Sequence, residues 1–513
     1  MALLVAAILA VSFFHLLRPI RDNDFFWHLK TGEWIWQHGE IPVKDPFSFP
    51  TEGLESIRER VIMTSPWLSQ VIFWGSYAAA GMPGIVLLRF AIIFCLVIVM
   101  MKRREGDGIL YAGLLLLFLS MLLKSYPVER PQVFSFLFFA LLLFLLEGRK
   151  VRKAAEHADR RYDRSLFITL PLLMLVWANM HAGYVTGMAT IVLFIFCEGL
   201  KFASPSLRPM ERSDYHVLAL AGMIGVLASF INPNTYRIFA DNILFQYDYV
   251  TFSNIEFQST VRIFRRYHDY SVLIYWGILA LSAVGLLVQI KKINITEASL
   301  LAATGFFSFT SVRYIAFFMI AALPAVGRLF SVTRLLNPAR ALILAAALAA
   351  AIFFTRDHLT LQPLSSGKWV DGERFPAAAA DFILTNNLKG NMYNYFDWGG
   401  YLIWRLAPER KVFIDGRTLY PHTYHQSDLI DRADDRRLGS IPAWKMALDT
   451  HNIQYTITPS SLPLVRALSQ DRDWIPVFFR YNTVIFVRDT PENRAVTDKY
   501  SIDRGQLSSW LTQ

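Results

Sequence analysis

The sequence predicts an α-helical polytopic membrane protein with a mixed α/β domain at its C-terminal end. Of the 513 residues, 54% are hydrophobic and only 18% are charged, whereas a soluble globular chain has roughly 45–50% apolar and about 25% charged residues. Apolar runs long enough to cross a hydrocarbon core of ~30 Å recur up to residue 355 and then stop. This composition excludes a disordered, collagen-like, coiled-coil or disulfide-rich chain.

About eleven apolar runs are long enough to span a membrane. The first has no charged segment before it and is followed by Arg18 rather than by a small-residue cleavage site, so we expect a retained anchor. Residues 67–81 are too short and too polar to span, and Trp67, Ile72 and Trp74 favour an interfacial helix on the outer leaflet. The expected spans are 2–18, 84–101, 108–124, 132–148, 165–179, 183–200, 215–231, 271–290, 295–311, 314–331 and 341–355.

The distribution of Lys and Arg predicts the orientation, because cytoplasmic loops collect these residues. One alternating set of loops holds 18 Lys and Arg in 53 residues, and the other holds 13 in 100. We therefore expect the first set and the N-terminus to be cytoplasmic and the C-terminal segment to lie outside. The net charge of +10 is then a topology signal and does not indicate nucleic-acid binding. The basic set is 102–107, 149–164, 201–214, 291–294 and 328–340; the other is 18–66, 124–132, 232–270 and 311–313.

The predicted domains are a transmembrane domain, 1–355, with outer loops 18–66 and 232–270, and an extracytoplasmic α/β domain, 356–513. The second has 19 Lys and Arg against 18 Asp and Glu and no run long enough to span. Its pattern predicts helices and strands, including a hairpin that turns at Tyr481-Asn482. The expected helices are 376–388, 401–406 and 445–452, and the expected strands are 391–396, 411–417, 453–458 and the two arms of 474–488.

Two carboxylates and a histidine follow the first span within seven residues. Asp22, Asp24 and His28 converge if a short helix begins there, since residues four apart share a helix face. Carboxylates in such a place can act as a general base for an acceptor hydroxyl or hold a divalent cation against phosphate oxygens. The alternative is that Asp22 or Asp24 caps the N-terminus of the helix.

Other polar residues fall at span ends on the predicted outer side, where a charged or amide group is costly unless it is paired or lines a wet cavity. Arg130 and Arg313 are candidate phosphate ligands because a guanidinium fork binds two oxygens at once; the alternatives are surface pairing or contact with lipid headgroups. The candidate substrate-binding residues are Glu129, Gln132, Asn179 and His181, together with Asp415 and Arg417 of the C-terminal domain, whose alternative roles are turns and internal salt bridges. Walker A, GxGxxG and HExxH motifs are absent from the sequence, so ATP-driven transport and zinc proteolysis have no support.

Several motifs resemble bacterial membrane proteins related to the GT-C glycosyltransferases, a largely uncharacterised group. They are DNDFFWHLKTGEWIWQHGEIPVKDPFSF from residue 22, WLSQ from 67, ERPQ from 129, NMHAGY from 179, INPN from 231, DWGGYLIW from 397 and VFIDGR from 412. The resemblance spans nearly the whole chain. The broader class is similar in layout, with many spans, an acidic motif in a long first outer loop and often an exported C-terminal domain.

The resemblance implies a glycosyltransferase of the inner membrane that uses a polyprenyl-phosphate-linked sugar on the outer face. The class places an essential acid in the first outer loop, which corresponds here to Asp24 as general base, with Asp22 as its helper or as a metal ligand. Arg130 and Arg313 would offset the charge of the departing lipid phosphate. The 232–270 loop has no strong second acidic motif, so a divalent cation such as Mg²⁺ or Mn²⁺ stays an open alternative. The acceptor is a lipid, a glycan or a protein.

Two other functions fit the same pattern. A lipid-linked glycan transporter or flippase would need polar groups at mid-membrane, whereas the spans here are mostly apolar, with Arg89 among the few charged exceptions. A non-catalytic scaffold for cell-envelope assembly would look nearly the same in sequence as an active transferase.

Overall fold

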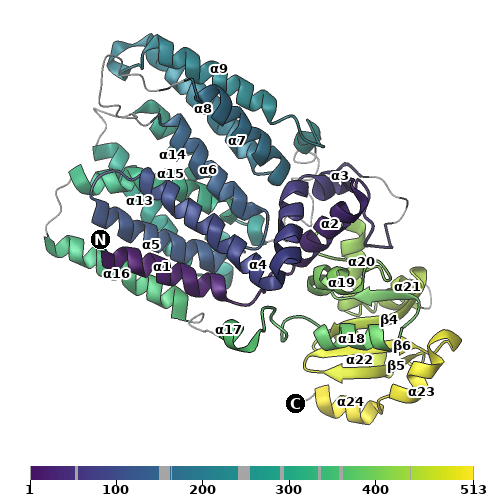
Figure 1. Ribbon diagram of the computed structural model, residues 1–513. Helices are drawn as coiled ribbons and strands as arrows, with labels where there is room; N and C mark the ends of the chain where they lie inside the picture. The colour runs from purple at the N-terminus through teal and green to yellow at the C-terminus, as the bar shows by residue number, and fades with distance from the viewer. Residues whose placement is uncertain are drawn as a thin grey trace. The chain divides into compact units, whose positions relative to one another are not determined.

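The computed structural model describes residues 2–51, 53, 56–126, 128–148, 162, 164–240, 255–288, 294–332, 337–356, 362–438 and 441–511. The chain forms two compact units (Figure 1). The first comprises Met1–Arg18, Ser76–Phe239 and Thr251–Gly367, and the second is built chiefly from Pro19–Gly75 and Lys368–Gln513. Most of the predicted first outer loop therefore belongs to the same compact unit as the C-terminal segment. The order of the chain does not reveal this grouping.

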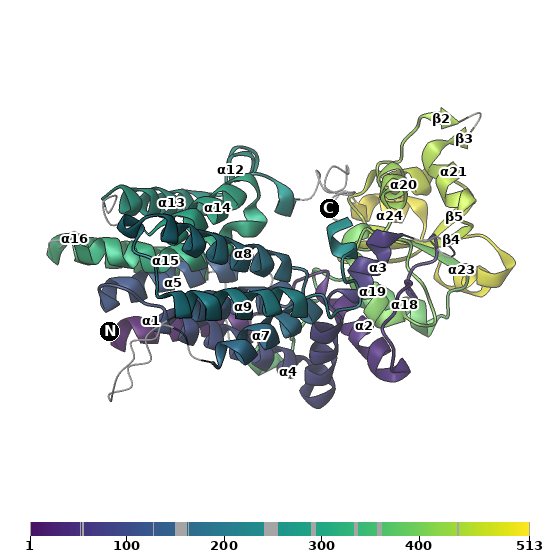
Figure 2. The same ribbon diagram turned by 90° about the horizontal axis from the view of Figure 1, so that it is seen from above.

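The first unit is a bundle of apolar helices, and the described part of each of the eleven predicted spans contains one of them. Helix α5 packs against α1, α15 and α16, while α7 packs against α9 (Figures 1 and 2). Five helical segments are long and apolar enough to cross a membrane among the described residues. The number of spans stays a prediction. The helices are α1 (Ala2–Leu17), α4 (Trp67–Lys102, of which Trp67–Gly75 belongs to the second unit), α5 (Gly108–Ser125), α6 (Gln132–Leu146), α7 (Leu166–Met180), α8 (Tyr184–Leu200), α9 (Arg212–Ala228), α13 (Ser271–Val288), α14 (Ile295–Thr310), α15 (Ile315–Val332) and α16 (Asn337–Thr355).

Helix α4 is two helices joined at a kink. Ala80 and Gly81 leave the helical conformation, and Gly81 has φ +62° and ψ −150°, a backbone state that only glycine adopts without strain. Pro83 follows and cannot donate a backbone hydrogen bond to the preceding turn. The break supports the expectation that 67–81 is a separate helix preceding the span at 84–101; its place in the membrane stays a prediction.

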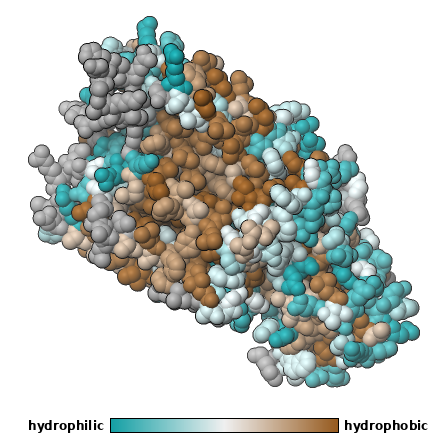
Figure 3. Space-filling model, in the orientation of Figure 1, coloured by the Kyte–Doolittle hydropathy of each residue, from teal (hydrophilic) through white to brown (hydrophobic). Residues whose placement is uncertain are grey.

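Large apolar side chains cover much of the outer surface of this unit. Examples are Ile168 of α7, Phe196 of α8 and Leu227 of α9, which are 70%, 62% and 67% exposed. Figure 3 shows this hydrophobic surface in brown over the helices. Such a wide apolar surface is unfavourable in water and favourable in lipid, so it agrees with a membrane protein.

The second unit is built on a four-stranded mixed sheet in the order β1-β4-β6-β5, where β1 is parallel to β4 and the other pairs are antiparallel. The predicted hairpin is confirmed, with β5 and β6 joined at Tyr481-Asn482. The predicted strand 411–417 is wrong: only Val412 bridges, and its partner is Ser48 of the first loop. The strands are β1 (Asn391–Asn394), β4 (Ile453–Pro459), β5 (Trp474–Arg480) and β6 (Thr483–Arg488), with a separate pair β2 (Arg437–Leu438) and β3 (Ile441–Pro442).

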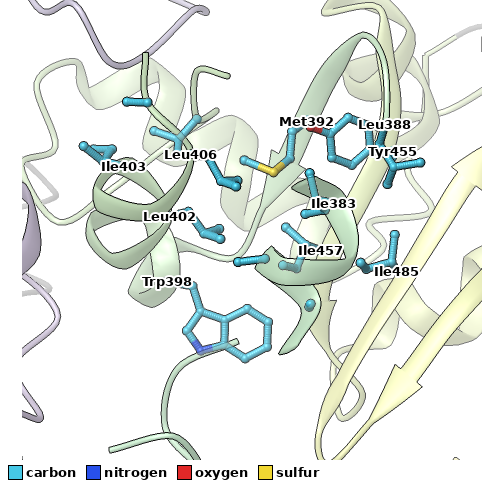
Figure 4. Close-up of a cluster of buried hydrophobic side chains, with 14 of the residues drawn as sticks. Ile383, Leu388, Met392, Trp398, Leu402, Ile403, Leu406, Tyr455, Ile457 and Ile485 are labelled. Carbon is cyan, nitrogen blue, oxygen red and sulfur yellow. The ribbon is translucent and has the colours of Figure 1, made fainter. Parts of the chain in front are cut away.

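Helices surround this sheet, and two of them come from the first loop. Helix α2 packs against α19, and Trp27 and Met63 enter the same buried core as Leu402 and Ile457. Figure 4 shows the part of this core between α19 and the sheet. The helices are α2 (Phe25–His38), α3 (Ile57–Thr64), α18 (Ala377–Thr385), α19 (Gly399–Leu406), α20 (Pro421–Asp431), α21 (Ala443–Thr450), α22 (Pro463–Gln470), α23 (Arg494–Tyr500) and α24 (Arg504–Leu511).

Candidate active site

The two carboxylates at the start of α2 have different environments. Asp22 Oδ1 accepts the backbone N–H groups of Asp24 at 3.0 Å and Phe25 at 2.8 Å. Asp22 is buried and caps the helix, as the alternative interpretation predicted. Asp24 stands at the N-cap position, but its side chain makes no capping hydrogen bond. The helix cap therefore uses the carboxylate of Asp22, and the carboxylate of Asp24 is not part of the cap.

Glycines from two distant motifs allow the Asn23-Asp24 segment to approach closely. A Cβ atom at Gly416 would lie 2.0 Å from Asp24 Oδ1, and one at Gly400 would lie 2.3 Å from the carbonyl oxygen of Asn23. A larger residue at Gly400 would displace the backbone of this segment, and one at Gly416 would displace the side chain of Asp24. The DND, WGGY and IDGR motifs, each noted separately in the sequence, thus meet at one place.

His28 lies one turn after Asp24 and is buried. Its Nδ1 atom is 3.2 Å from Gln70 Nε2, and its ring lies against Trp27 with the ring centroids 3.5 Å apart and the ring planes tilted by 33°. Because Gln70 can only donate from Nε2, Nδ1 is the acceptor in this pair. The contact orients the imidazole, and Gln70 is part of the WLSQ motif.

Arg374 and Asp397 border the same segment and were missed by the sequence analysis. Arg374 Nε donates to Asn23 Oδ1 at 3.3 Å. Burial raises the pKa of Asp397, while Arg374 and hydrogen bonds from Tyr395 and Asn23 oppose this shift. Asp397 is the first residue of the DWGGYLIW motif, two positions before its glycine pair, and this place in the motif is the sequence signal that could have identified it.

Arg417 and Asp415 form a buried ionic network. The guanidinium of Arg417 reaches Asp45 at 2.6 Å and Asp415 at 2.6 Å, and these three side chains are at most 3% exposed. Burial lowers the pKa of Arg417, but the carboxylates of Asp415 and Asp45 together raise it above its ordinary value, so the guanidinium stays charged. The network joins the first loop to the 412–417 segment and favours a structural role for the two predicted substrate-binding residues.

Glu129 pairs with a buried cation of the first unit. Its Oε1 atom is 2.5 Å from Arg89 Nη1, and both side chains are 1% exposed. Arg89 Nη2 also donates to the carbonyl of Arg18 at 3.2 Å. Glu129 therefore fixes α4 near the end of α1, and the sequence did not reveal this pairing because Arg89 lies 40 residues away.

Arg130 and Arg313 are brought together by a short turn, η3 (Ile255–Phe257). Arg130 pairs with Glu256 at 3.0 Å, and the Arg313 guanidinium lies 5.1 Å from the centroid of the Phe257 ring. Glu256 is one of the four acidic residues in the sequence of the 232–270 loop, for which no strong acidic motif was found. Two others, Asp241 and Asp248, lie outside the described residues.

A cavity of about 220 Å³ lies beside this turn. Arg313 and Gln132, both predicted, line it with Lys124, Glu256 and Asp269. Lys124 is a second cation that the sequence analysis did not select, and its Nζ atom lies 4.7 Å from the centroid of the Phe354 ring. Arg313 and Lys124 are cations of a kind that binds a phosphate group, and the carboxylates of Glu256 and Asp269 line the same cavity.

Asn179 and His181 hold the break between α7 and α8. Asn179 Nδ2 donates to the carbonyl of Ile231 at 2.8 Å, which joins the NMHAGY motif to the INPN motif. The Nδ1 atom of His181 accepts the backbone N–H of Gly183 at 3.0 Å and lies 2.7 Å from Ser135 Oγ. These contacts favour a structural role for both residues.

The part of the chain that the structure describes contains no group of three or more His, Cys, Asp or Glu side chains that could hold a metal ion. Asp22, the predicted metal ligand, accepts the two N–H groups of the helix cap at its Oδ1 atom. No catalytic step is therefore assigned to a cation on the residues that the structure describes.

No protein-family model matches the chain, and no curated protein matches its sequence. Solved structures do match. The apo oligosaccharyltransferase of Archaeoglobus fulgidus aligns with a TM-score of 0.55 at 11% identity, covering 89% of this chain and 69% of its own. AglB from the same organism, in complex with an inhibitory peptide and a dolichol-phosphate, aligns with a TM-score of 0.52 at 10% identity, covering 96% and 75%.

Apo ArnT from Cupriavidus metallidurans aligns with a TM-score of 0.53 at 14% identity, and the match covers 94% of this chain and 97% of ArnT. AglB and ArnT are both GT-C glycosyltransferases. The chain has the GT-C fold. The resemblance seen in the motifs is thus confirmed at the level of fold, and the GT-C layout explains a helical membrane unit in the same chain as a mixed α/β unit.

Proposed function

We propose that this GT-C protein is a glycosyltransferase that moves a sugar from a polyprenyl-phosphate donor to an acceptor on the outer face of the inner membrane. The fold supports glycosyl transfer in general, since both similar proteins are glycosyltransferases. AglB was solved with a dolichol-phosphate, which supports a lipid-linked donor. The acceptor is a lipid, a glycan or a protein.

Asp24 carries the catalytic part of the proposal. It sits against the backbone of Gly416, and the neighbouring Asp22 already caps the helix and so keeps Asp24 in register. Packing that fixes a carboxylate without using its oxygens for a cap suits a general base, which must accept a proton at a defined point. His28, held by Gln70, is a positioning residue in this proposal.

The reaction is a direct displacement. Asp24 accepts the proton of the acceptor hydroxyl, the acceptor oxygen bonds to the anomeric carbon, and the bond from that carbon to the phosphate oxygen breaks. The polyprenyl phosphate leaves with the electron pair of the broken bond. Arg313 and Lys124 offset its negative charge at the cavity beside η3, and Arg130 positions Glu256 at the same turn.

The Asp24→Asn variant tests the base assignment against a matched control, Asp22→Asn. Asparagine cannot accept the proton, so we expect Asp24→Asn to lower the transfer rate by about 10²–10⁴-fold. In Asp22→Asn the amide oxygen still caps the helix, so most activity should remain. Transfer would be measured with the full-length protein, a polyprenyl-phosphate-sugar and membrane extracts as the acceptor source. Full activity of Asp24→Asn would disprove the assignment, and loss in Asp22→Asn alone would move the role to Asp22.

A further inference from the structure

A basic surface near the cavity beside η3 has no role in the proposed reaction. Helix α12 (Thr260–Tyr267) directs Thr260 and Ile263 inward, where both are buried. Trp276 of α13 donates its indole N–H to Thr260 Oγ1 at 3.1 Å, and Figure 2 shows α12 next to α13 and α14. The outward face carries three exposed arginines, Arg262, Arg265 and Arg266.

These three residues follow the spacing i, i+3 and i+4, so their guanidinium groups share one face of the helix. The described part of the chain provides no salt bridge to any of them, and Arg266 instead lies 5.6 Å from the centroid of the Tyr267 ring. Like charges at this spacing repel each other. An anionic partner would relieve the repulsion, and this surface is named the α12 basic face.

The position of α12 in the chain places this face near lipid. The helix is followed directly by α13, which is long and apolar enough to span a membrane. Eight residues extend only about 12 Å along a helix, so the arginines lie close to the membrane boundary. Tyr267 and Tyr270 are 45% and 64% exposed immediately before α13, as expected of aromatic side chains at the headgroup level.

The predicted membrane topology does not explain why three arginines gather on α12. The 232–270 loop belongs to the predicted outer set, in which Lys and Arg are sparse, yet three of its four cations are on α12. The bias that places positive charge in cytoplasmic loops acts against this cluster. We propose that the α12 basic face binds the phosphate headgroups of anionic phospholipids, with Tyr267 and Tyr270 inserted between them.

Hydrogen–deuterium exchange of residues 260–270 tests this proposal in the full-length protein. The protein would be placed in nanodiscs of phosphatidylcholine alone or with about 30% phosphatidylglycerol. We expect the anionic lipid to slow exchange in this segment several-fold, and 0.5 M salt to reverse most of the effect, because headgroup contacts of exposed arginines are screened. Equal exchange in the two nanodiscs would overturn the proposal.

The variant Arg262→Gln/Arg265→Gln/Arg266→Gln should abolish the lipid effect, and unchanged exchange elsewhere in the chain shows that it is folded. The matched control replaces Arg466, Arg472 and Arg480, three exposed arginines of the second unit, and removes the same charge. Arg480 also lies 5.2 Å from a tyrosine ring, like Arg266. This control should keep the full lipid effect. Protection produced by an acidic polysaccharide, and not by phosphatidylglycerol, would assign the face to an acidic glycan instead. The test is independent of glycosyl transfer.

Discussion

Asp24 fits in its place only because residue 416 is a glycine and has no side chain. In Gly416→Ala the new methyl group would meet Asp24 Oδ1 at 2.0 Å, so the partly exposed carboxylate must move. A displacement of about 1 Å at a catalytic group can cost on the order of 10²-fold in rate. We expect Gly416→Ala to lower the transfer rate by about 10–100-fold with little change in thermal stability. Gly372→Ala is the control, because no atom lies within 4 Å of its added Cβ. Full activity of Gly416→Ala would show that this close contact is not required.

The raised pKa of Asp431 makes us expect that the stability of the fold around α20 depends on pH. Burial raises its pKa to about 7, although Tyr393 donates a hydrogen bond to it at 2.6 Å. A carboxyl whose pKa is higher in the folded state binds its proton more tightly there, so the stabilisation is complete below about pH 4 and is lost as pH rises to about 7. The loss is of the order of 2–4 kcal/mol.

Asp431→Asn should remove this dependence, because the amide is neutral at every pH and still accepts the hydrogen bond from Tyr393. The measurement is hydrogen exchange of α20 in the full-length protein at pH 5 and pH 8, corrected for the intrinsic effect of pH. We expect wild-type α20 to open more at pH 8 and the variant to open equally at both. Asp498→Asn, an exposed control, should behave as wild type. A variant with the wild-type pH profile would contradict the assignment.

At the scale of elements, one ionic network holds the first loop on the C-terminal fold. Replacing Arg417 by Met would leave Asp45 and Asp415 buried without their cation, which typically costs about 3–5 kcal/mol. We expect Arg417→Met to lower the melting temperature of the full-length protein and to expose residues 41–59 to protease. Arg432→Met removes an exposed pair with Asp428 and should cost no more than about 1 kcal/mol. Equal effects of the two substitutions would argue against a structural role for Arg417.

The helices and the β5-β6 hairpin could be predicted from the sequence because their signals are local. A run of apolar residues predicts a membrane helix from about twenty neighbouring residues. The two short strand patterns on either side of Tyr481-Asn482 predict the hairpin in the same way, from neighbouring residues alone. The strand predicted at 411–417 failed because Val412 finds its partner at Ser48, in the first loop. No spacing rule relates segments that are more than 360 residues apart.

The same limit applies to the candidate site. The sequence identified the DND, WGGY and IDGR motifs, but their meeting around Asp24 depends on close backbone contacts that only a three-dimensional fold provides. Glu129 and Arg417 were selected as binding residues because they are charged. Their ion pairs with Arg89 and Asp45 favour a structural role for both residues. Lys124 was missed because a lysine at the end of a span has no distinctive pattern.

At the scale of the whole molecule, the surfaces of the two units differ in chemistry. The exposed side chains of the first unit are largely apolar, and those of the second are largely polar, as Figure 3 shows in brown and teal. One unit is therefore suited to lipid and the other to water. The proposed function requires the water-facing unit to lie outside the cell, because it carries Asp24 and the acceptor is on that side.

Labelling of single cysteines tests this orientation. We expect Gln470→Cys, in the second unit, to react with a membrane-impermeant maleimide in intact spheroplasts, and Glu211→Cys, in a predicted cytoplasmic loop, to react only after lysis. Both positions are exposed. The background is Cys95→Ala, since Cys95 is exposed and Cys197 is buried. The excess of Lys and Arg in the cytoplasmic set supports this result, since such loops are retained inside. The reverse labelling pattern would place Asp24 in the cytoplasm, and a transferase acting on the outer face would then be excluded.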